Sequence, residues 1–349
     1  MNKIIIFSFC MLLFSSCVKE GVGNPDPNPA PTPDVAHFKT SEEFSVPVKD
    51  GYVTQVKLGE EIIAEAVSPM TILIPRRSET ARSTDGPQLV YVPISEYPNE
   101  VLENSARLYQ VVCFEDSKNG DYDFNDLVIH VIYKLQGDRF GFGVQPVALG
   151  STKSIKLGCA VYKGSTLLFK GLITPEGKDC REQYFQGQTG FLNTVGETVN
   201  SESYKKSFLG STIRNWKINK VSDPGAMHVE WYIEVDNGIE LYALSSNYIS
   251  ESFDKNGIPY GLVMTNTGFQ YMDKGQVCGF DWFNYPKESK SIKDVYPGLW
   301  EWLTTGKSYD AFKDVYNADP IPADAYPASS LGVFVSTEVD VCNSKYTQN

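Results

Sequence analysis

Residues 228–244, with the sequence HVEWYIEVDNGIELYAL, decide the fold class of this chain. Apolar and polar residues alternate from 228 to 236, which is the period of a strand that buries one face. Asn237-Gly238 follows, and a second apolar run starts at Ile239. Asn-Gly between two such runs is the strongest short-range signal of an antiparallel hairpin. The stretch therefore predicts a hairpin of strands at 228–236 and 239–244.

Other runs rich in β-branched and aromatic residues predict further strands. These runs lie at 52–57, 70–75, 89–92, 108–114, 127–134, 155–162, 167–172 and 260–264, and alternating valines at 333–341 predict a closing strand. A clear helical spacing occurs in the apolar stripe from Ile292 to Leu303. Proline opens helices but breaks their interiors, so we expect a short turn up to Tyr296 and a helix from Pro297 to near Gly306. The pattern predicts an all-β fold: an antiparallel β-sandwich, jelly-roll-like, with one short helix near the C-terminus.

The first 36 residues indicate export and a lipid anchor. Residues 1–16 combine Lys3 with an apolar stretch and small residues, as in a secretory signal peptide. Residues 14–17, FSSC, resemble the lipobox of bacterial lipoproteins, which implies cleavage before Cys17 and its acylation. An ordinary cleaved signal peptide is the alternative. The proline-rich stretch up to residue 36 reads as an extended spacer after the lipidated cysteine.

The rest of the chain divides into two parts. Residues 37–105 form an N-terminal β segment, either a small β domain or extra strands of the main sandwich, and 106–349 form the main sandwich domain. A polar, turn-rich stretch at 76–86 is a candidate boundary.

Charge and cysteine content limit the partners. The chain has 31 basic and 43 acidic residues, so loss of Lys3 with the signal peptide leaves 30 against 43 and a net charge of −13. This balance argues against a nucleic-acid partner. Five cysteines remain after Cys10 and Cys17, and Cys159 with Cys180 is the favoured disulfide. Three scattered histidines and no Cys-x-x-Cys argue against a zinc site, and we expect His228 to be a solvated surface residue.

Residues 115–126, EDSKNGDYDFND, hold five carboxylates and two carboxamides directly before the apolar run that starts at Leu127. Like charges this close repel one another, and a bound hard cation removes that cost. Calcium binds carboxylate, amide and backbone oxygens, and Gly120 permits the turn that aims them inward. An EF-hand is excluded, because position six is Asp126 instead of glycine and position twelve is Ile132 instead of glutamate. The alternative is an Asn119-Gly120 hairpin turn whose acids point into solvent.

We predict that Ca2+ binds through the oxygens of five side chains, with backbone carbonyls completing the shell: Asp116, Asp121, Asp123, Asn125 and Asp126. The strand from Leu127 to Tyr133 should leave this loop with its apolar face toward the core, so the ion would order the fold and perform no chemistry.

A family resemblance adds to this interpretation. Residues 114–116, FED, and 120–128, GDYDFNDLV, resemble the opening signature of the LruC domain family of bacterial surface and outer-membrane lipoproteins. Residues 256–262, NGIPYGL, and 283–288, FNYPKE, resemble its closing region, and the resemblance spans about 108–316. It implies an all-β, extracytoplasmic, noncatalytic protein of the kind found among surface antigens and adhesion or matrix components. The chain departs from the family pattern after Glu240.

Three functions compete. The first is a calcium-stabilised surface binding or adhesion lipoprotein, held to the outer membrane, at the cell surface, by Cys17. The second is a carbohydrate-binding protein of a glycan-capture system, a hypothesis that an exposed row of Trp282, Tyr285 and Trp302 would favour. The third is an enzyme, which we do not expect, because nucleophile-elbow, zinc-protease and phosphate-loop motifs are missing.

Overall fold

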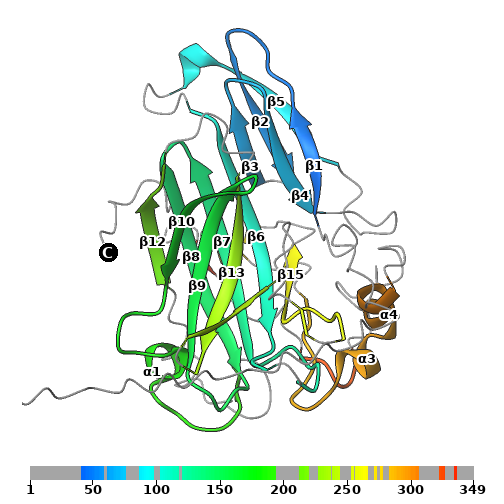
Figure 1. Ribbon diagram of the computed structural model, residues 1–349. Coiled ribbons are helices and arrows are strands. Elements are labelled where there is room, and N and C mark those ends of the chain that lie inside the picture. Colours follow the sequence, from blue (N-terminus) through cyan, green and yellow to red (C-terminus); the bar gives the residue numbers. More distant parts are fainter. Residues whose placement is uncertain are drawn as a thin grey trace, which may run out of the picture. The chain divides into compact units, whose positions relative to one another are not determined.

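The computed structural model describes residues 41–58, 61–75, 86–97, 103–117, 120–193, 212–219, 227–236, 238–243, 253–254, 256–265, 271–272, 276–277, 283–305, 322–326 and 334–335 (Figure 1). The predicted signal peptide, Cys17 and the spacer lie outside these residues, as do Cys278, Cys342 and Trp282.

The hairpin predicted at 228–244 is confirmed. Strand β13 (Met227–Val235) pairs antiparallel with β14 (Ile239–Tyr242), and Val235 is the register partner of Ile239. Trp231 and Ile233 on the apolar face of β13 are completely inaccessible to solvent, but the opposite face is also buried, with Glu230 2 % and Tyr232 3 % exposed. The local pattern therefore predicted the turn, whereas the single buried face that the alternation indicated was too narrow an expectation.

A large antiparallel sheet forms the centre of the fold. The three long strands β6 (Ser105–Phe114), β7 (Leu127–Gln136) and β8 (Arg139–Leu149) follow one another as a meander. On the outer side of β8 lie β11 (Leu192–Asn193) and β12 (Thr212–Lys217), and β15 (Gly261–Thr265) pairs with the C-terminal half of β6. The long meander places the loop 115–126 at one end of the sheet.

A second sheet faces the first across an apolar core. It has the order β10 (Thr166–Leu172), β9 (Ile155–Lys163), β13 and β14. One core cluster joins residues of both sheets, including Ile129 and Val131 of β7, Leu157 of β9 and Trp231 of β13. Every strand pair within the described residues is antiparallel, and the predicted all-β sandwich is confirmed.

The N-terminal strands extend the central sheet. Strand β3 (Glu61–Ala66) pairs with β6 at Ala64 and Ala106, and the sheet continues through β2 (Tyr52–Leu58) to β5 (Gln88–Pro93), after which comes the 3-10 turn η2 (Ile94–Glu96). Strands β1 (Ser41–Val46) and β4 (Met70–Pro75) form a separate two-stranded sheet. Strands β2, β3 and β5 thus extend the central sheet, whereas β1 and β4 form a sheet of their own.

The helices are short. As predicted, a turn of helix α3 (Ile292–Val295) ends before Tyr296, and α4 (Pro297–Thr305) starts at the proline. Sequence analysis did not foresee α1 (Cys180–Phe185), whose N-cap Asp179 accepts a hydrogen bond from the Glu182 N–H. Near the C-terminus, β16 (Tyr271–Met272), β17 (Gln276–Val277) and β18 (Phe334–Val335) make a small sheet, and the rest of the predicted closing strand lies outside the described residues.

Strand β7 is buried on both faces. Leu127, Ile129 and Val131 belong to the core between the two sheets, whereas Val128 and Ile132 belong to a second core with α4 and the N-terminal strands. The expectation that one apolar face of this strand meets the core was therefore too narrow. A continuous apolar run such as LVIHVIY is typical of a strand covered on both sides.

A candidate cation site in the loop between strands 6 and 7

The acidic segment forms the loop between β6 and β7. Phe114 and Leu127 are register partners, so residues 115–126 are the whole connection between the two strands. Glu115 is fixed at the start of the loop, where its N–H donates to the Tyr260 carbonyl at 2.7 Å. A connection of this length is not a two-residue hairpin turn.

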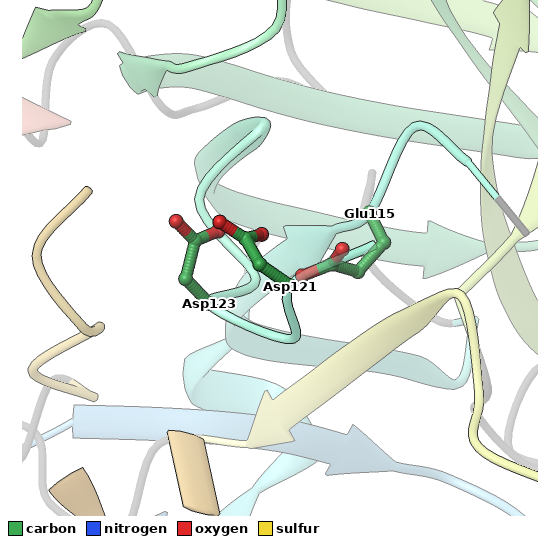
Figure 2. Close-up of side chains that lie close together, drawn as sticks. All are labelled: Glu115, Asp121 and Asp123. Carbon is green, nitrogen blue, oxygen red and sulfur yellow. The ribbon is translucent and has the colours of Figure 1, made fainter. Parts of the chain in front are cut away.

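Three carboxylates of this loop meet (Figure 2). Glu115, Asp121 and Asp123 each offer an oxygen, and these oxygens all lie within 4.8 Å of one another. Ligands of one calcium ion at 2.3–2.6 Å are separated by at most about 5 Å. The three oxygens are therefore close enough to share one ion.

Glu115 is the most constrained of the three. Its side chain is 2 % exposed, and its Oε1 accepts a hydrogen bond from the Phe124 N–H at 2.7 Å. Its Oε2 is buried without a hydrogen-bond partner among the described residues. Burial raises the pKa of Glu115 well above its usual range, and the charge of Asp126 raises it further. A buried carboxylate oxygen without a partner is costly, and a cation would satisfy it.

Glycine at position 120 makes room for this carboxylate. A β carbon at Gly120 would lie 1.7 Å from Glu115 Oε2, so the Glu115 carboxylate would have to shift. The glycine thus allows the backbone to approach Glu115 closely.

The backbone of the loop is held in an uncommon conformation. Tyr122 and Phe124 both have positive φ values, 60° and 52°, which are costly for aromatic residues. Packing holds them there: Phe124 is completely buried in the core beside α4, and the Tyr122 ring lies 5.3 Å from that of Trp300. With these two rings fixed, the carboxylate of Asp123 between them is directed to the site.

A distant segment closes the other side of the loop. The N–H of Ile292 donates to the Tyr122 carbonyl at 2.7 Å, and the N–H of Ser289 donates to Asp123 Oδ2 at 2.8 Å. The Asn125 side-chain nitrogen donates to the Pro286 carbonyl at 3.2 Å. The two sequence motifs that carry the LruC resemblance are therefore neighbours in space.

Asp116 has a different partner. Its Oδ1 is paired with Lys153 Nζ at 2.8 Å, and its Oδ2 accepts a hydrogen bond from the Ser151 hydroxyl. Its N–H donates to Asp126 Oδ2 at 2.8 Å. Asp116 and Asp126 thus form a hydrogen-bonded rim beside the group of three carboxylates.

The pKa values of buried Asp123 and half-buried Asp126 are both raised. Burial raises the pKa of Asp123 to about 7, and the charge of Asp121 contributes to the shift. Burial likewise raises the pKa of Asp126 to about 7, with Asp116 as the next cause. The site therefore favours the protonated acids unless a positive charge joins it.

The structure brings together part of the predicted ligand set. Asp121 and Asp123 converge, Asp126 accepts the Asp116 N–H, and Asp116 is paired with Lys153. Sequence analysis did not choose Glu115 as a ligand. Its signal was available: Glu115 continues the alternation of Val111 and Cys113, which face the same core as Phe124. The ligand set itself stays a prediction.

Other expectations are wrong. Cys159 and Cys180 are buried free thiols and form no disulfide. His228 is only 8 % exposed, stacks on Tyr162 with 5.3 Å between ring centroids, and has its Nε2 3.4 Å from Glu230 Oε1. The alternative in which the acids point into solvent does not hold for Glu115 and Asp123, which are both 2 % exposed, whereas Asp121 is exposed.

The proposed glycan platform is not at the surface. Tyr285 is completely buried and Trp302 is 1 % exposed, and both belong to the core beside the acidic loop. Tyr285 donates its hydroxyl hydrogen to Asn193 Oδ1 at 2.7 Å. Two members of the predicted stacking row therefore have a packing role.

Comparisons with known proteins give little. No family model matches the chain, and no curated protein matches it. Among solved structures, the crystal structure of "a Putative lipoprotein from Bacteroides ovatus" aligns with a TM-score of 0.33 and 12% sequence identity, over 79% of this chain and 92% of the other. A match at this level carries no argument about fold or function.

Proposed function

We propose that this chain is a lipid-anchored extracytoplasmic protein whose β-sandwich is stabilised by calcium bound in the loop between β6 and β7. The observation that carries the calcium site is Glu115 Oε2, a buried carboxylate oxygen without a partner among the described residues, in a group with Asp121 and Asp123. Calcium suits such a site because it prefers oxygen ligands and accepts irregular geometry.

The ion would neutralise charges that the fold forces together. Glu115, Asp121 and Asp123 would hold it, and backbone carbonyls of the loop would complete the shell. Because Asp123 also accepts the Ser289 N–H, binding at the loop would stabilise the segment 283–290 that covers it. This is an ordering role, in keeping with a surface binding or adhesion lipoprotein without catalytic activity.

Thermal unfolding tests the calcium site. The mature chain with Cys17→Ser should unfold at a higher temperature in excess calcium than in chelator. With a dissociation constant of roughly 0.1 to 1 mM, typical of extracellular modules, tenfold excess adds about 1.4 kcal/mol to the free energy of unfolding. Superimposable melting curves would refute the proposal, and magnesium at the same concentration is the control for ionic strength.

The lipid anchor rests on the sequence of residues 14–17. The part of the chain that the structure describes contains no helix long and apolar enough to cross a membrane. Cys17→Ser should give a protein without lipid that is released into the soluble fraction. The wild-type chain, which carries the lipid, should stay with outer membranes. Retention of the Cys17→Ser variant on membranes after a high-salt wash would contradict a sole lipid attachment, and protease treatment of intact cells would test surface exposure.

A further inference from the structure

Strand β5 is an edge of the central sheet, and one side of its backbone is open. It pairs with β2, and among the described residues no other strand lies against it. Of the six large apolar side chains that are exposed in this part of the chain, three gather here: Val90 and Ile94 are 36 % exposed and Tyr91 is 41 % exposed. An open edge with apolar side chains is a template for a further strand.

The pairing with β2 shows which backbone groups of β5 point outward. The N–H of Ile94, the first residue after β5, donates to the Gly51 carbonyl at 3.0 Å, so these two residues form a hydrogen-bonded pair. Hydrogen-bonded and non-hydrogen-bonded pairs alternate along an antiparallel ladder. The backbone groups of Leu89, Tyr91 and Pro93 therefore face away from β2. Pro93 agrees with this assignment, because a position that faces β2 would need an N–H.

Strands at the other ends of the two sandwich sheets have features that hinder pairing. Strand β10 has a register shift between Leu167 and Phe169 and carries Lys170. Strand β14 has four residues, one of them Glu240, and β11 has two residues. Bulges, short length and charges are among the usual protections of an edge. Strand β5 has six residues, no charged residue and no register shift against β2, so apart from Pro93 at its end it lacks these protections.

A second copy of β5 fits this edge in the antiparallel direction. When Tyr91 lies opposite Tyr91 of the other copy, the two residues exchange N–H···O=C bonds. In the same register, the Leu89 N–H meets the Pro93 carbonyl of the other copy. Both outward N–H groups of each copy then have an acceptor, so the edge is complementary to itself.

Charge at the two ends of the strand favours the antiparallel direction. Lys57 is the register partner of Gln88 at the start of β5, and the exposed Glu96 follows the end of the strand. An antiparallel pair brings the Lys57 end of one copy to the Glu96 end of the other. A parallel pair would instead bring like charges together at both ends.

We propose that β5 is a self-association edge, through which two copies of this chain pair antiparallel with the two-fold axis at Tyr91. The central sheets of the two copies then become one continuous sheet. A contact through a single strand pair is small, and small interfaces belong to weak, transient complexes, so we expect a dimer that forms as the concentration rises. The pairing does not depend on calcium, because none of its residues lies in the acidic loop.

Cysteine cross-linking tests the pairing and its register. The background is the mature chain in which three cysteines are changed to serine: Cys17, Cys278 and Cys342. The three remaining thiols are buried. Tyr91→Cys should give a disulfide-linked dimer, because the paired α carbons at the axis are ~5.5 Å apart, within the range of a disulfide. Ile94→Cys is the matched control: Ile94 is similarly exposed, but it lies ~20 Å from its counterpart in the antiparallel pair.

The yields of the two cysteine variants decide the register. Under mild oxidation, Tyr91→Cys should give about tenfold more linked dimer than Ile94→Cys. Equal yields would indicate random collision and would overturn the proposal. A higher yield from Ile94→Cys would overturn the antiparallel direction and the axis at Tyr91.

Sedimentation of the Cys17→Ser chain over a range of concentrations is a second measurement that needs no added cysteine. Val90→Lys, which places a charge on the edge, should raise the dissociation constant of the dimer by about tenfold or more. Leu167→Lys, a change at an exposed position of β10, should leave it unchanged. Because Val90 and Leu167 are both exposed, neither change disturbs the core. A parent chain that stays monomeric at every concentration, or a Val90→Lys variant with the parent's dissociation constant, would overturn the proposal.

Discussion

Two loops of this protein join antiparallel strands and contain Asn-Gly, yet they differ in almost every other respect. Between β13 and β14, Val235 pairs with Ile239, and the connection is short and exposed at Asp236 and Gly238. Between β6 and β7 the connection takes twelve residues and buries Glu115, Asp123 and Asn125. A turn needs only a few residues with the right backbone geometry.

The difference bears on the proposed role of the longer loop. Glu115 and Asp123 are not solvated turn residues, because the core packing of Phe124 and the contacts of residues 286–292 hold them inside, whereas Asp121 is exposed. Buried like charges weaken a fold unless something compensates them. The comparison therefore points to a ligand at one loop and to none at the other.

The largest expected effect comes from Asp123→Ala. This change removes a proposed ligand and the acceptor of the Ser289 N–H, so at saturating calcium the free energy of unfolding should fall by about 2 to 4 kcal/mol. The matched change in the short loop, Asp236→Asn, should alter it by less than about 0.5 kcal/mol, since asparagine tolerates the positive φ there. Chemical denaturation with and without calcium measures both. An equal decrease in the free energy of unfolding in both variants would contradict a special role of the longer loop.

Glu115→Gln should produce effects of opposite sign with and without calcium. Because burial raises the pKa of Glu115, its ionised form costs free energy in the folded state, and the neutral amide should stabilise the calcium-free protein. The same change should remove most of the gain from calcium. Denaturation curves for both states give the sign, and a variant less stable than the parent in chelator would contradict a strained, unpaired acid.

The benefit of calcium should depend on pH. The folded-state pKa values of Asp123 and Asp126 are raised to about 7 from 3.8, so between these limits the native state binds more protons than the unfolded state. Without calcium, stability therefore falls as pH rises through this range. Calcium needs the ionised acids, so its gain should be largest near pH 8 and small at pH 5. Melting temperatures at both pH values measure this, and an equal gain at each would exclude these aspartates.

The smallest effect should follow Lys153→Met. The Lys153 and Asp116 pair is partly exposed, and such pairs contribute about 0 to 1 kcal/mol. Calcium should still bind with nearly the same affinity, because Asp116 lies outside the group of three carboxylates. Loss of calcium binding in this variant would return Asp116 to the ligand set.

Local patterns in the sequence predicted the local structure well. The hairpin at 228–244, the helix that starts at Pro297 and the position of the acidic loop each depend on neighbours within about twelve residues. The direction of Glu115 was missed because it follows from the pleat of β6. The contacts of Pro286 and Ser289 with the loop were beyond reach, because they come from a segment about 160 residues away in the sequence.

The disulfide prediction failed for a related reason. Cys159 and Cys180 both face the core between the two sheets. Cys159 lies in strand β9, whereas Cys180 is the first residue of helix α1. In the fold, Cys180 Sγ instead lies 3.6 Å from Thr174 Oγ1. Closeness in the sequence correctly indicated that the two thiols share a core. It could not indicate whether their α and β carbons have the separation and direction that a disulfide requires.

The three buried thiols can serve as probes of local opening of the fold. Burial raises the pKa of Cys113 and Cys159, and of Cys180 to about 12, so alkylating reagents meet reactive thiolate only when a region opens. Cys113 lies in the core next to the acidic loop, and the other two lie in the core between the sheets. In variants that keep only one cysteine, the alkylation rate would therefore measure how often the core around that cysteine opens. Calcium bound at the loop should lower the alkylation rate of Cys113 more than that of Cys159.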